Sequence, residues 1–448
     1  MKRIAIIGAG LTGLTAALYL KEAGIPYTIF EKENHTGGVI QSTSTGDFLY
    51  EHGPNSGIIS NIETALLLEK LSPCCQVITA SKTAKKRWIW KNNTWETLPA
   101  GLWQAIKTPL FTWNDKLKIL KEPFVKKGKN PDENLAEMVK RRLGKSFLDY
   151  AIDPFISGIY AGDTHYLIPK YALPKLYRLE QEYGSFIKGA IRKRKEMNAI
   201  EKQKISKEIF STRKGLQGLI DCLTEQAGKE NIRLNQSGLQ IDKNDSGYNI
   251  NGERFSEIIS TVNAGALPGL FPFIDTNELK NITRLRYAKL IQIAVGFKQW
   301  NGISLKAFGG LIPGKEKRNL LGILFMSALF KGRAPENGAL LAVFAGGMKN
   351  EKIYEKTDDE IYEIVKTELI ELFKIKNFKP EIFKIFRYRK AIAQYGIDSK
   401  ERFASIQRIE AQNKGLYLKG SIIDGIGIPD RIKQAKSVVE LIKNNNES

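Results

Sequence analysis

A glycine-rich loop near the N-terminus limits the possible folds more than any other feature of this sequence. The run from Arg3 to Ile7 has the apolar character of a buried parallel strand, and Gly8-Ala9-Gly10-Leu11-Thr12-Gly13 follows it at once. Leu14 to Lys21 then reads as a helix. The first glycine permits a tight turn, the second lets the backbone approach a pyrophosphate, and the third lets helix and strand pack closely. The free N–H groups at the helix start favour phosphate, so the pattern predicts a Rossmann-like dinucleotide site.

A second strand, Tyr27 to Phe30, ends at Glu31, which is placed to accept hydrogen bonds from a ribose diol. The glycine pair Gly37-Gly38 comes soon afterwards. Backbone N–H groups there can reach the far side of the pyrophosphate, which favours FAD over NAD, although a simple turn would also account for the pair. We interpret His35, between the acid and the glycines, as a loop residue and not as a base.

The first twenty residues also resemble a signal peptide, because Met1-Lys2-Arg3 precedes an apolar run to Leu20. The three glycines inside that run argue against a signal peptide. The longest apolar stretch elsewhere, Leu320 to Phe330, is well short of the roughly 20 residues needed to cross a bilayer. We therefore expect a chain that touches a membrane at most.

Charge and cysteine content narrow the class of protein further. The chain has 69 Lys+Arg against 48 Asp+Glu, a net charge of +21, which implies a polyanionic partner such as nucleic acid, an anionic membrane or an acidic substrate. Generally lysine-rich coding would explain part of the excess. The three cysteines, Cys74, Cys75 and Cys222, form no C-x-x-C pair. They predict neither a structural disulfide nor a zinc site, and they fit a reducing cytoplasm.

Further motifs lie along the chain. In chain order they are Glu51–Ser56, Asp153–Asp163, Gly309–Pro313, Phe330–Pro335, Ala391–Tyr395 and Gly420–Ile432. These segments resemble signatures of the protoporphyrinogen/coproporphyrinogen oxidase family, FAD-dependent flavoproteins of the amine-oxidase-like class. The similarity runs from Met1 to about Ala435. Two positions depart from the family pattern: Ala393 replaces a proline, and Arg431 stands where members usually have cysteine.

The resemblance implies a mixed α/β and α+β fold, in which an FAD-binding Rossmann-like domain is assembled from three segments. On this basis we expect flavin segments at 1–80, 208–270 and 391–448, a mainly helical substrate or membrane insertion at 81–207, and an antiparallel-sheet substrate domain at 271–390. The last helix should aim its N-terminus at the pyrimidine end of the flavin. The expected FAD-binding residues are Gly8, Ala9, Gly10, Leu11, Thr12, Gly13, Glu31, Lys32, Gly37, Gly38, Val39, Gly53, Pro54, Asn55, Ser56, Ile426, Gly427 and Ile428.

The family removes six electrons from a porphyrinogen in three hydride transfers to the flavin, which molecular oxygen then reoxidises. The cofactor carries this chemistry, so we assign no catalytic acid or base and no metal; neither His52 nor His165 lies in a motif that requires one. Arg87 matches the position of a family arginine that holds a substrate propionate, although an exposed hairpin cation is the other reading. Gly158 is the second candidate substrate residue.

Residues 81–207 also carry clustered lysines and arginines between apolar residues such as Trp103, Phe111 and Trp113. This composition suits peripheral attachment to an anionic bilayer, on the inner face of the cell membrane. Alternatively, the three aromatic residues belong to the core and the lysines to a solvated face. A nucleic-acid partner is not expected, and the oligomeric state, monomer or homodimer, is left open.

Two substrates compete within the family. Protoporphyrinogen IX, with two propionates, suits a membrane-associated enzyme, and the basic clusters favour it; coproporphyrinogen III, with four, suits a more basic cavity. A flavin amine oxidase would need acidic steering of a cationic substrate, which the charge of +21 opposes. A non-catalytic binding protein that only retains the nucleotide fold would lack a flavin spectrum.

Overall fold

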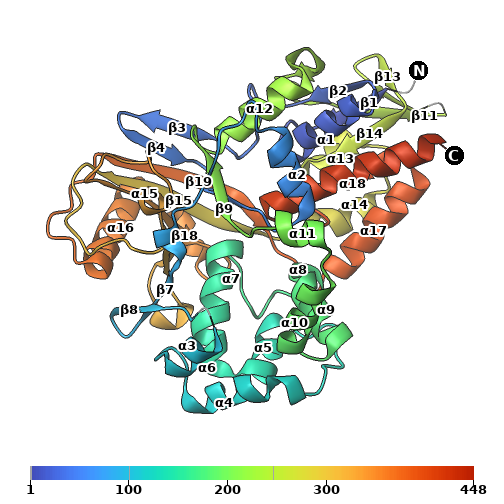
Figure 1. The fold of residues 1–448 in the computed structure, drawn as a ribbon. Coiled ribbons are helices and arrows are strands. Elements are labelled where there is room, and N and C mark those ends of the chain that lie inside the picture. The colour runs from blue at the N-terminus through green and yellow to red at the C-terminus, as the bar shows by residue number, and fades with distance from the viewer. Residues whose placement is uncertain (1–2, 100, 246, 448) are drawn as a thin grey trace.

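A parallel sheet of five strands forms one end of the molecule, and its strands come from three separated stretches of chain (Figure 1). The computed structural model describes residues 3–99, 101–245 and 247–447. The strand order is β10 (Ile232–Arg233), β2 (Tyr27–Phe30), β1 (Ile4–Ile7), β14 (Glu257–Ser260) and β20 (Leu416–Leu418). All four pairings are parallel. The carboxyl ends of these strands therefore meet at one edge, where ligands of open α/β sheets bind.

The side chains of β1 alternate between two cores. Ile4 and Ile6 pack with α1 (Leu11–Glu22), α12 (Gln217–Ala227) and α18 (Ile428–Glu447). Ala5 and Ile7 pack on the opposite side, with the meander of β11 (Ile241–Asn244), β12 (Gly247–Ile250) and β13 (Glu253–Phe255). Helices α13 (Leu267–Leu270), α14 (Thr276–Thr283) and α17 (Ser399–Gln412) cover that second side. Burial on both faces explains the unbroken apolar run that the sequence shows there.

A second sheet has seven strands, in the order β19 (Ile382–Ala393), β15 (Tyr287–Phe297), β18 (Ala339–Gly346), β17 (Leu320–Phe325), β16 (Gly309–Leu311), β7 (Arg87–Lys91) and β8 (Thr94–Thr97). Helix α16 (Asp358–Phe373) covers one face, and α15 (Met326–Leu329) follows β17. Strands β7 and β8 form a hairpin, and Asn92 and Asn93 turn it with φ of 50° and 61°. The sheet differs from the expectation in two ways. The hairpin β7–β8 adds strands from outside residues 271–390, and β7 pairs parallel to β16.

Two small sheets connect these parts. One is the hairpin of β3 (Ser42–Thr45) and β4 (Phe48–Glu51). The other places β9 (Ile209–Thr212) between β5 (Gly57–Ile58) and β6 (Val77–Thr79), close to α2 (Ile62–Lys70). In this sheet β6, which leads into the insertion, pairs with β9, which leads out of it.

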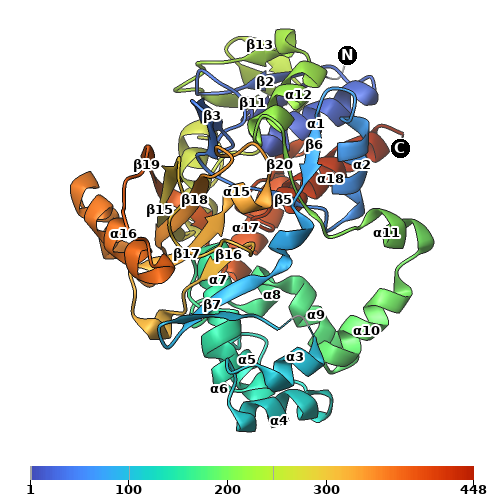
Figure 2. The ribbon, with the colours of Figure 1, turned by 60° about the vertical axis from the view of Figure 1, so that its left-hand side comes forward.

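The helical insertion lies below both sheets in Figures 1 and 2. A buried ionic network holds it together: Arg142 donates to Glu122 and Glu180, each at 2.7 Å. No helix among the described residues is long and apolar enough to cross a membrane. The helices are α3 (Leu102–Lys107), α4 (Trp113–Lys121), α5 (Leu135–Leu143), α6 (Lys145–Phe147), α7 (Asp153–Tyr160), α8 (Pro169–Ala172), α9 (Pro174–Tyr183), α10 (Phe186–Glu196) and α11 (Ala199–Lys204).

The cysteines correct one expectation. Cys74 and Cys222, which are 148 positions apart along the chain, form a disulfide with Cα atoms 5.8 Å apart. The pairing arises because α12 packs against the end of α2, where Cys222 Sγ lies 3.8 Å from Leu71 O. Spacing along the sequence carries no trace of this contact. The pairing also removes one reason for assigning the chain to a reducing compartment.

Candidate flavin and substrate site

The loop from Gly8 to Gly13 lies at the carboxyl end of β1, and its three glycines have different surroundings. Gly8 has φ of +104°, and a Cβ there would lie 2.7 Å from Thr261 Oγ1. A Cβ on Gly13 would lie 2.0 Å from Gly8 O, so that glycine is required for helix and strand to pack. Gly10 faces open space, and it begins α1 without a side-chain cap. The first N–H groups of α1, from Leu11 to Gly13, therefore remain available to an anion beside Gly10.

Glu31, at the end of β2, is tied to this loop. Its Oε2 accepts a hydrogen bond from the Ala9 N–H at 2.7 Å, and its Oε1 accepts from the Glu33 N–H at 3.0 Å. The carboxylate is buried, with 6 % of the residue exposed. Lys32 points away from the loop into an exposed ion pair with Glu33.

The second glycine pair lies directly against the first loop. The Gly37 N–H donates to Ala9 O at 2.8 Å, and Gly37 forms a bridge with Gly10. Both Gly37 and Gly38 have positive φ, +96° and +61°. A Cβ on Gly37 would lie 2.8 Å from Ile220 of α12, so this helix backs the glycine pair. The structure thus brings together two loops that the sequence separates.

The segment Gly53–Ser56 connects the flavin region to the seven-stranded sheet. A Cβ on Gly53 would lie 2.2 Å from the carbonyl of Val39, a residue that is 58 % exposed. The Asn55 amide donates to Gln292 Oε1 at 3.3 Å, and Gln292 donates in turn to Glu51 O at 2.8 Å. Asn55 Oδ1 is buried and has no partner among the described residues. An orphaned buried acceptor at this place fits a bound group that carries an N–H donor.

Sequence reasoning missed Gln292 and the buried ion pair of Glu51 and Arg333. The signal for Gln292 was a polar residue in the part of strand β15 from Leu290 to Phe297 that is otherwise apolar. Arg333 Nη1 donates to Glu51 Oε1 at 3.1 Å, and Glu51 also accepts from the Leu216 N–H at 3.1 Å. Burial raises the pKa of Glu51 above its ordinary value despite the neighbouring guanidinium. Glu51 thus ties β4 both to Arg333 and to the start of α12.

The third candidate segment, Ile426 to Ile428, leads into α18 at the same edge of the parallel sheet. Gly425 has φ of +57°, and Asp430 Oδ2 accepts from the Gly427 N–H at 3.0 Å. Asn61, which caps α2, donates to Pro429 O at 2.9 Å. The edge therefore carries the starts of α1 and α18, the glycine pair and Glu31. This combination fits a dinucleotide with a diphosphate at its centre.

The two predicted substrate residues lie on neighbouring elements. Arg87 pairs with Gly309 of β16, and its guanidinium lies 5.3 Å from the centre of the Phe308 ring. No ion pair of Arg87 occurs among the described residues. A Cβ on Gly158 would lie 2.4 Å from Leu311, so Gly158 lets α7 pack closely on β16.

An apolar surface on the seven-stranded sheet continues from Gln292. Gln292 pairs with Phe344, and Leu290 pairs with Tyr388, so these four side chains share one face. Leu290, Phe344 and Tyr388 are each partly exposed. His52 stacks on Phe386 of the same strand at 4.3 Å and lies within hydrogen-bond distance of Thr43 and Gln41. These residues form an apolar floor next to the Gly53–Ser56 segment.

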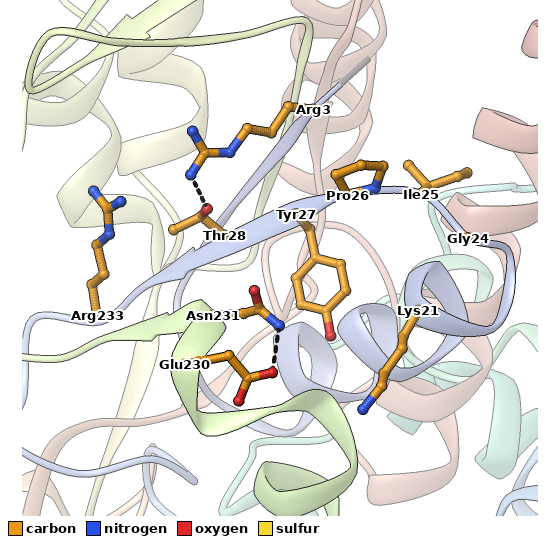
Figure 3. A pocket seen from close by; sticks show the side chains of 10 residues that line it. All are labelled: Arg3, Lys21, Gly24, Ile25, Pro26, Tyr27, Thr28, Glu230, Asn231 and Arg233. Atoms are coloured by element: carbon orange, nitrogen blue, oxygen red, sulfur yellow. Dashed lines mark hydrogen bonds between the residues drawn. The ribbon is translucent and has the colours of Figure 1, made fainter. Parts of the chain in front are cut away.

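A surface pocket of about 400 Å³ lies at the opposite edge of the parallel sheet (Figure 3). Its basic side chains are already engaged: Arg3 and Arg233 pair with Glu253, and Lys21 donates to Gln226 O at 2.8 Å. It lies at the amino ends of β1 and β2, away from the edge at which such sheets bind ligands. The carboxyl edge, and not this pocket, therefore has the features that fit a dinucleotide.

Comparison with known proteins agrees with this geometry. The family model for flavin-containing amine oxidoreductases matches residues 11–438. The chain belongs to this family. It is a flavin-dependent oxidoreductase, and FAD is its cofactor.

Among its relatives, the mitochondrial protoporphyrinogen oxidase of Nicotiana tabacum is 28% identical over 484 residues, covering 100% of this chain and 96% of that protein. The coproporphyrinogen III oxidase of Bacillus subtilis (strain 168) is 26% identical over 467 residues, covering 98% and 97%. A crystal structure from Exiguobacterium sp. 255-15, described as a candidate protoporphyrinogen oxidase, has a TM-score of 0.80 at 22% identity, covering 99% of each chain. A redesigned putrescine oxidase has the same fold, with a TM-score of 0.72 at 14% identity and 99% of each chain covered.

Proposed function

We propose that this chain oxidises protoporphyrinogen IX to protoporphyrin IX in haem biosynthesis, with molecular oxygen as the final electron acceptor. The observation that carries the proposal is similarity over the whole length to proteins named protoporphyrinogen oxidase, in several eukaryotes. Coproporphyrinogen III is the second candidate substrate, because a coproporphyrinogen III oxidase is also similar over the whole length. The apolar floor and an unpaired arginine suit a macrocycle with carboxylate arms.

Bound FAD supplies the hydride acceptor, and the chain's residues supply position and a dry environment. The Gly8–Gly13 loop and the start of α1 would hold the diphosphate, and Glu31 the ribose. Asn55, fixed by Gln292, would orient the ring relative to the sheet. The side chains Leu290, Phe344 and Tyr388 would cover one face of the substrate and exclude water. We propose that residues 1–80, 208–270 and 391–448 bind the flavin. Residues 81–207 and 271–390 would then bind the substrate.

Arg87 would hold a propionate. The Arg87→Ala variant is expected to raise KM by about tenfold or more, the loss of one charge-assisted hydrogen-bond pair, with little change in kcat. Arg87→Lys should recover part of that loss, because lysine keeps the positive charge but lacks the paired N–H donors of the guanidinium. The exposed Lys85→Ala is the matched control. An unchanged KM in Arg87→Ala removes Arg87 from the site.

The substrate test compares the two porphyrinogens directly. Purified protein is given each one aerobically, and porphyrin fluorescence is followed over time. A higher kcat/KM with protoporphyrinogen IX supports the proposal. A higher kcat/KM with coproporphyrinogen III replaces it with the second candidate. Oxidation of putrescine or another amine with neither porphyrin formed would contradict both.

The helical region carries a surface that fits an anionic membrane. Trp113, Leu117, Leu120 and Phe124 follow one another at helical spacing along α4 and the turn after it, and they are 70%, 53%, 51% and 82% exposed. The neighbouring basic residues Lys118, Lys121, Lys126 and Lys127 are exposed. The expected core alternative holds for Phe111, which is 4% exposed, but not for Trp103 at 79%. An apolar stripe flanked by lysines matches an interfacial anchor.

We propose that this stripe attaches the enzyme peripherally to the cytoplasmic face of an anionic membrane. Sedimentation with vesicles containing phosphatidylserine should capture the protein, and the double variant Trp113→Ser, Leu117→Ser should stay in solution. Ile397→Ser, a change at another exposed apolar residue that is 54% exposed, is the matched control. Equal capture of the parent, the double variant and Ile397→Ser would show that the stripe is not the membrane anchor.

A further inference from the structure

Arg431 stands at a position where the family pattern that the sequence resembles has cysteine, and a single hydrogen bond within the described residues holds its side chain. It lies in the first turn of α18, directly after the Ile426–Ile428 segment. Its Nη2 donates to Gly425 O at 3.0 Å. Its Nε and Nη1 atoms are buried and have no hydrogen-bond partner among the described residues. None of the described ion pairs includes it.

The carboxylates of Asp430 and Asp424 act on this charge through space, but neither forms an ion pair with it among the described residues. Asp430, the adjacent residue, already accepts from the Gly427 N–H. The hydroxyl of Tyr395 lies 2.7 Å from the same Gly425 carbonyl that Arg431 uses. Burial therefore lowers the pKa of the guanidinium, and two donors stay unsatisfied.

The position of Arg431 indicates which part of the cofactor it faces. The diphosphate is served by the Gly8–Gly13 loop, and the ribose by Glu31, at the other end of the site. Arg431 lies where α18 meets Tyr395, just beyond the end of β19 of the seven-stranded sheet. An FAD molecule that extends from the phosphate loop to this junction brings its ring there. When the ring takes up two electrons, negative charge gathers at its pyrimidine edge.

We propose that Arg431 supplies a fixed positive charge to the pyrimidine edge of the flavin and stabilises the reduced cofactor. The charge adds to the dipole of α18, whose amino end lies at the same place. A neutral cysteine at this position gives only the dipole. The flavin of this chain is therefore the stronger oxidant compared with the same protein carrying cysteine.

The test measures the flavin in the absence of any porphyrinogen, so it rests on FAD binding and not on the identity of the substrate. The holoenzyme, Arg431→Gln, Arg431→Cys and Arg431→Lys are compared by their two-electron midpoint potential. The absorbance of the reduced flavin against pH gives the pKa of its N1 position. Lys433→Gln, an exposed lysine of the same helix, removes one charge at the surface and is the matched control.

Removing the charge should shift the reduction equilibrium by about tenfold against the reduced form, which is about 30 mV for a two-electron couple. The pKa of the reduced N1 should rise in Arg431→Gln and Arg431→Cys, while Arg431→Lys and Lys433→Gln stay near the parent value. A potential and a pKa that do not change in Arg431→Cys would overturn the proposal. If Arg431→Gln fails to fold, Arg431→Cys carries the test, because cysteine is the residue of the resembled family pattern at this position.

Discussion

Two arginines show how differently the helical region (residues 81–207) and the flavin region (residues 1–80, 208–270 and 391–448, where we propose that FAD binds) are built. Arg142, in the helical region, is fully buried, and its guanidinium reaches Glu122, Glu180 and the Gly184 carbonyl. Arg431, in the flavin region, reaches one carbonyl, and its buried Nε and Nη1 atoms have no hydrogen-bond partner among the described residues. The first arginine is satisfied by the chain itself. The second is incomplete until something else binds.

The same contrast extends to the carboxylates of each region. Burial alone would raise the pKa of Glu122, but hydrogen bonds from Ser185 and the Phe186 N–H and the contact with Arg142 hold it below its ordinary value. In the flavin region, burial raises the pKa of Glu51. A region that pairs its own charges is stable by itself, whereas a region that leaves donors open depends on its ligand.

The largest expected effect comes from breaking the complete network. Arg142→Met should destabilise the protein by about 3–5 kcal/mol, because it leaves Glu122 and part of Glu180 buried without a countercharge. Urea denaturation followed by tryptophan fluorescence measures this loss. The flavin potential of the fraction that remains folded should not change. A loss below about 1 kcal/mol would show that the network relaxes around the missing charge.

The disulfide gives the next effect, and it belongs to the flavin region. Cys74→Ser should lower stability by about 2–4 kcal/mol, since the bond closes a long loop between α2 and α12. Thermal unfolding with and without reductant checks it. The parent protein, denatured without reductant, should show one free thiol, that of Cys75. In the folded protein, burial raises the pKa of this thiol to about 11. Three free thiols in freshly isolated protein would contradict the cross-link.

The contact between Asn55 and Gln292, which joins the flavin region to the seven-stranded sheet, is expected to contribute less to stability. Gln292→Leu leaves the Glu51 carbonyl and one Asn55 contact without partners, at a cost of about 1–3 kcal/mol. Because Asn55 would lose its fixed orientation, FAD should dissociate more readily, as measured by flavin fluorescence on dilution. Ile293→Val, on the opposite face of the same strand, is the control and should keep its flavin. Equal flavin loss in both variants would count against the role of Gln292.

The smallest expected effect is that of pH: acid should destabilise the helical region before it destabilises the flavin region. Glu122 and Glu180 have lowered folded pKa values, so their contribution is present above an unfolded pKa of about 4.3 and is lost as the pH falls through the folded value. Each contributes a slope of at most about 1.4 kcal/mol per pH unit. Far-UV circular dichroism should report loosening of the helical region as the pH falls below the unfolded value of about 4.3, before flavin release. Simultaneous release at one pH would refute independent behaviour.

The sequence predicts those parts of the molecule in which neighbours along the chain are neighbours in space. The Gly8–Gly13 loop and the strands Ile4–Ile7 and Tyr27–Phe30 belong to this class, because turn chemistry and periodicity act locally. Gln292, Arg333 and the Cys74–Cys222 pair could not be predicted in the same way. Their partners are 237, 282 and 148 residues away, and nothing in the local pattern records them. The two glycine loops were predicted separately, but their contact through Gly37 and Ala9 required the folded chain.

The hairpin β7–β8 has a consequence for how this family can change over time. It leaves the flavin region, adds two strands to a sheet built mostly from residues two hundred positions later, and only then continues into the helices. Residues 81–207 are therefore not a module that recombination could delete or exchange intact. Any replacement must bring its own edge strands with the correct register against β16. Change in this region is expected to proceed by substitution on the helix surfaces while the hairpin persists.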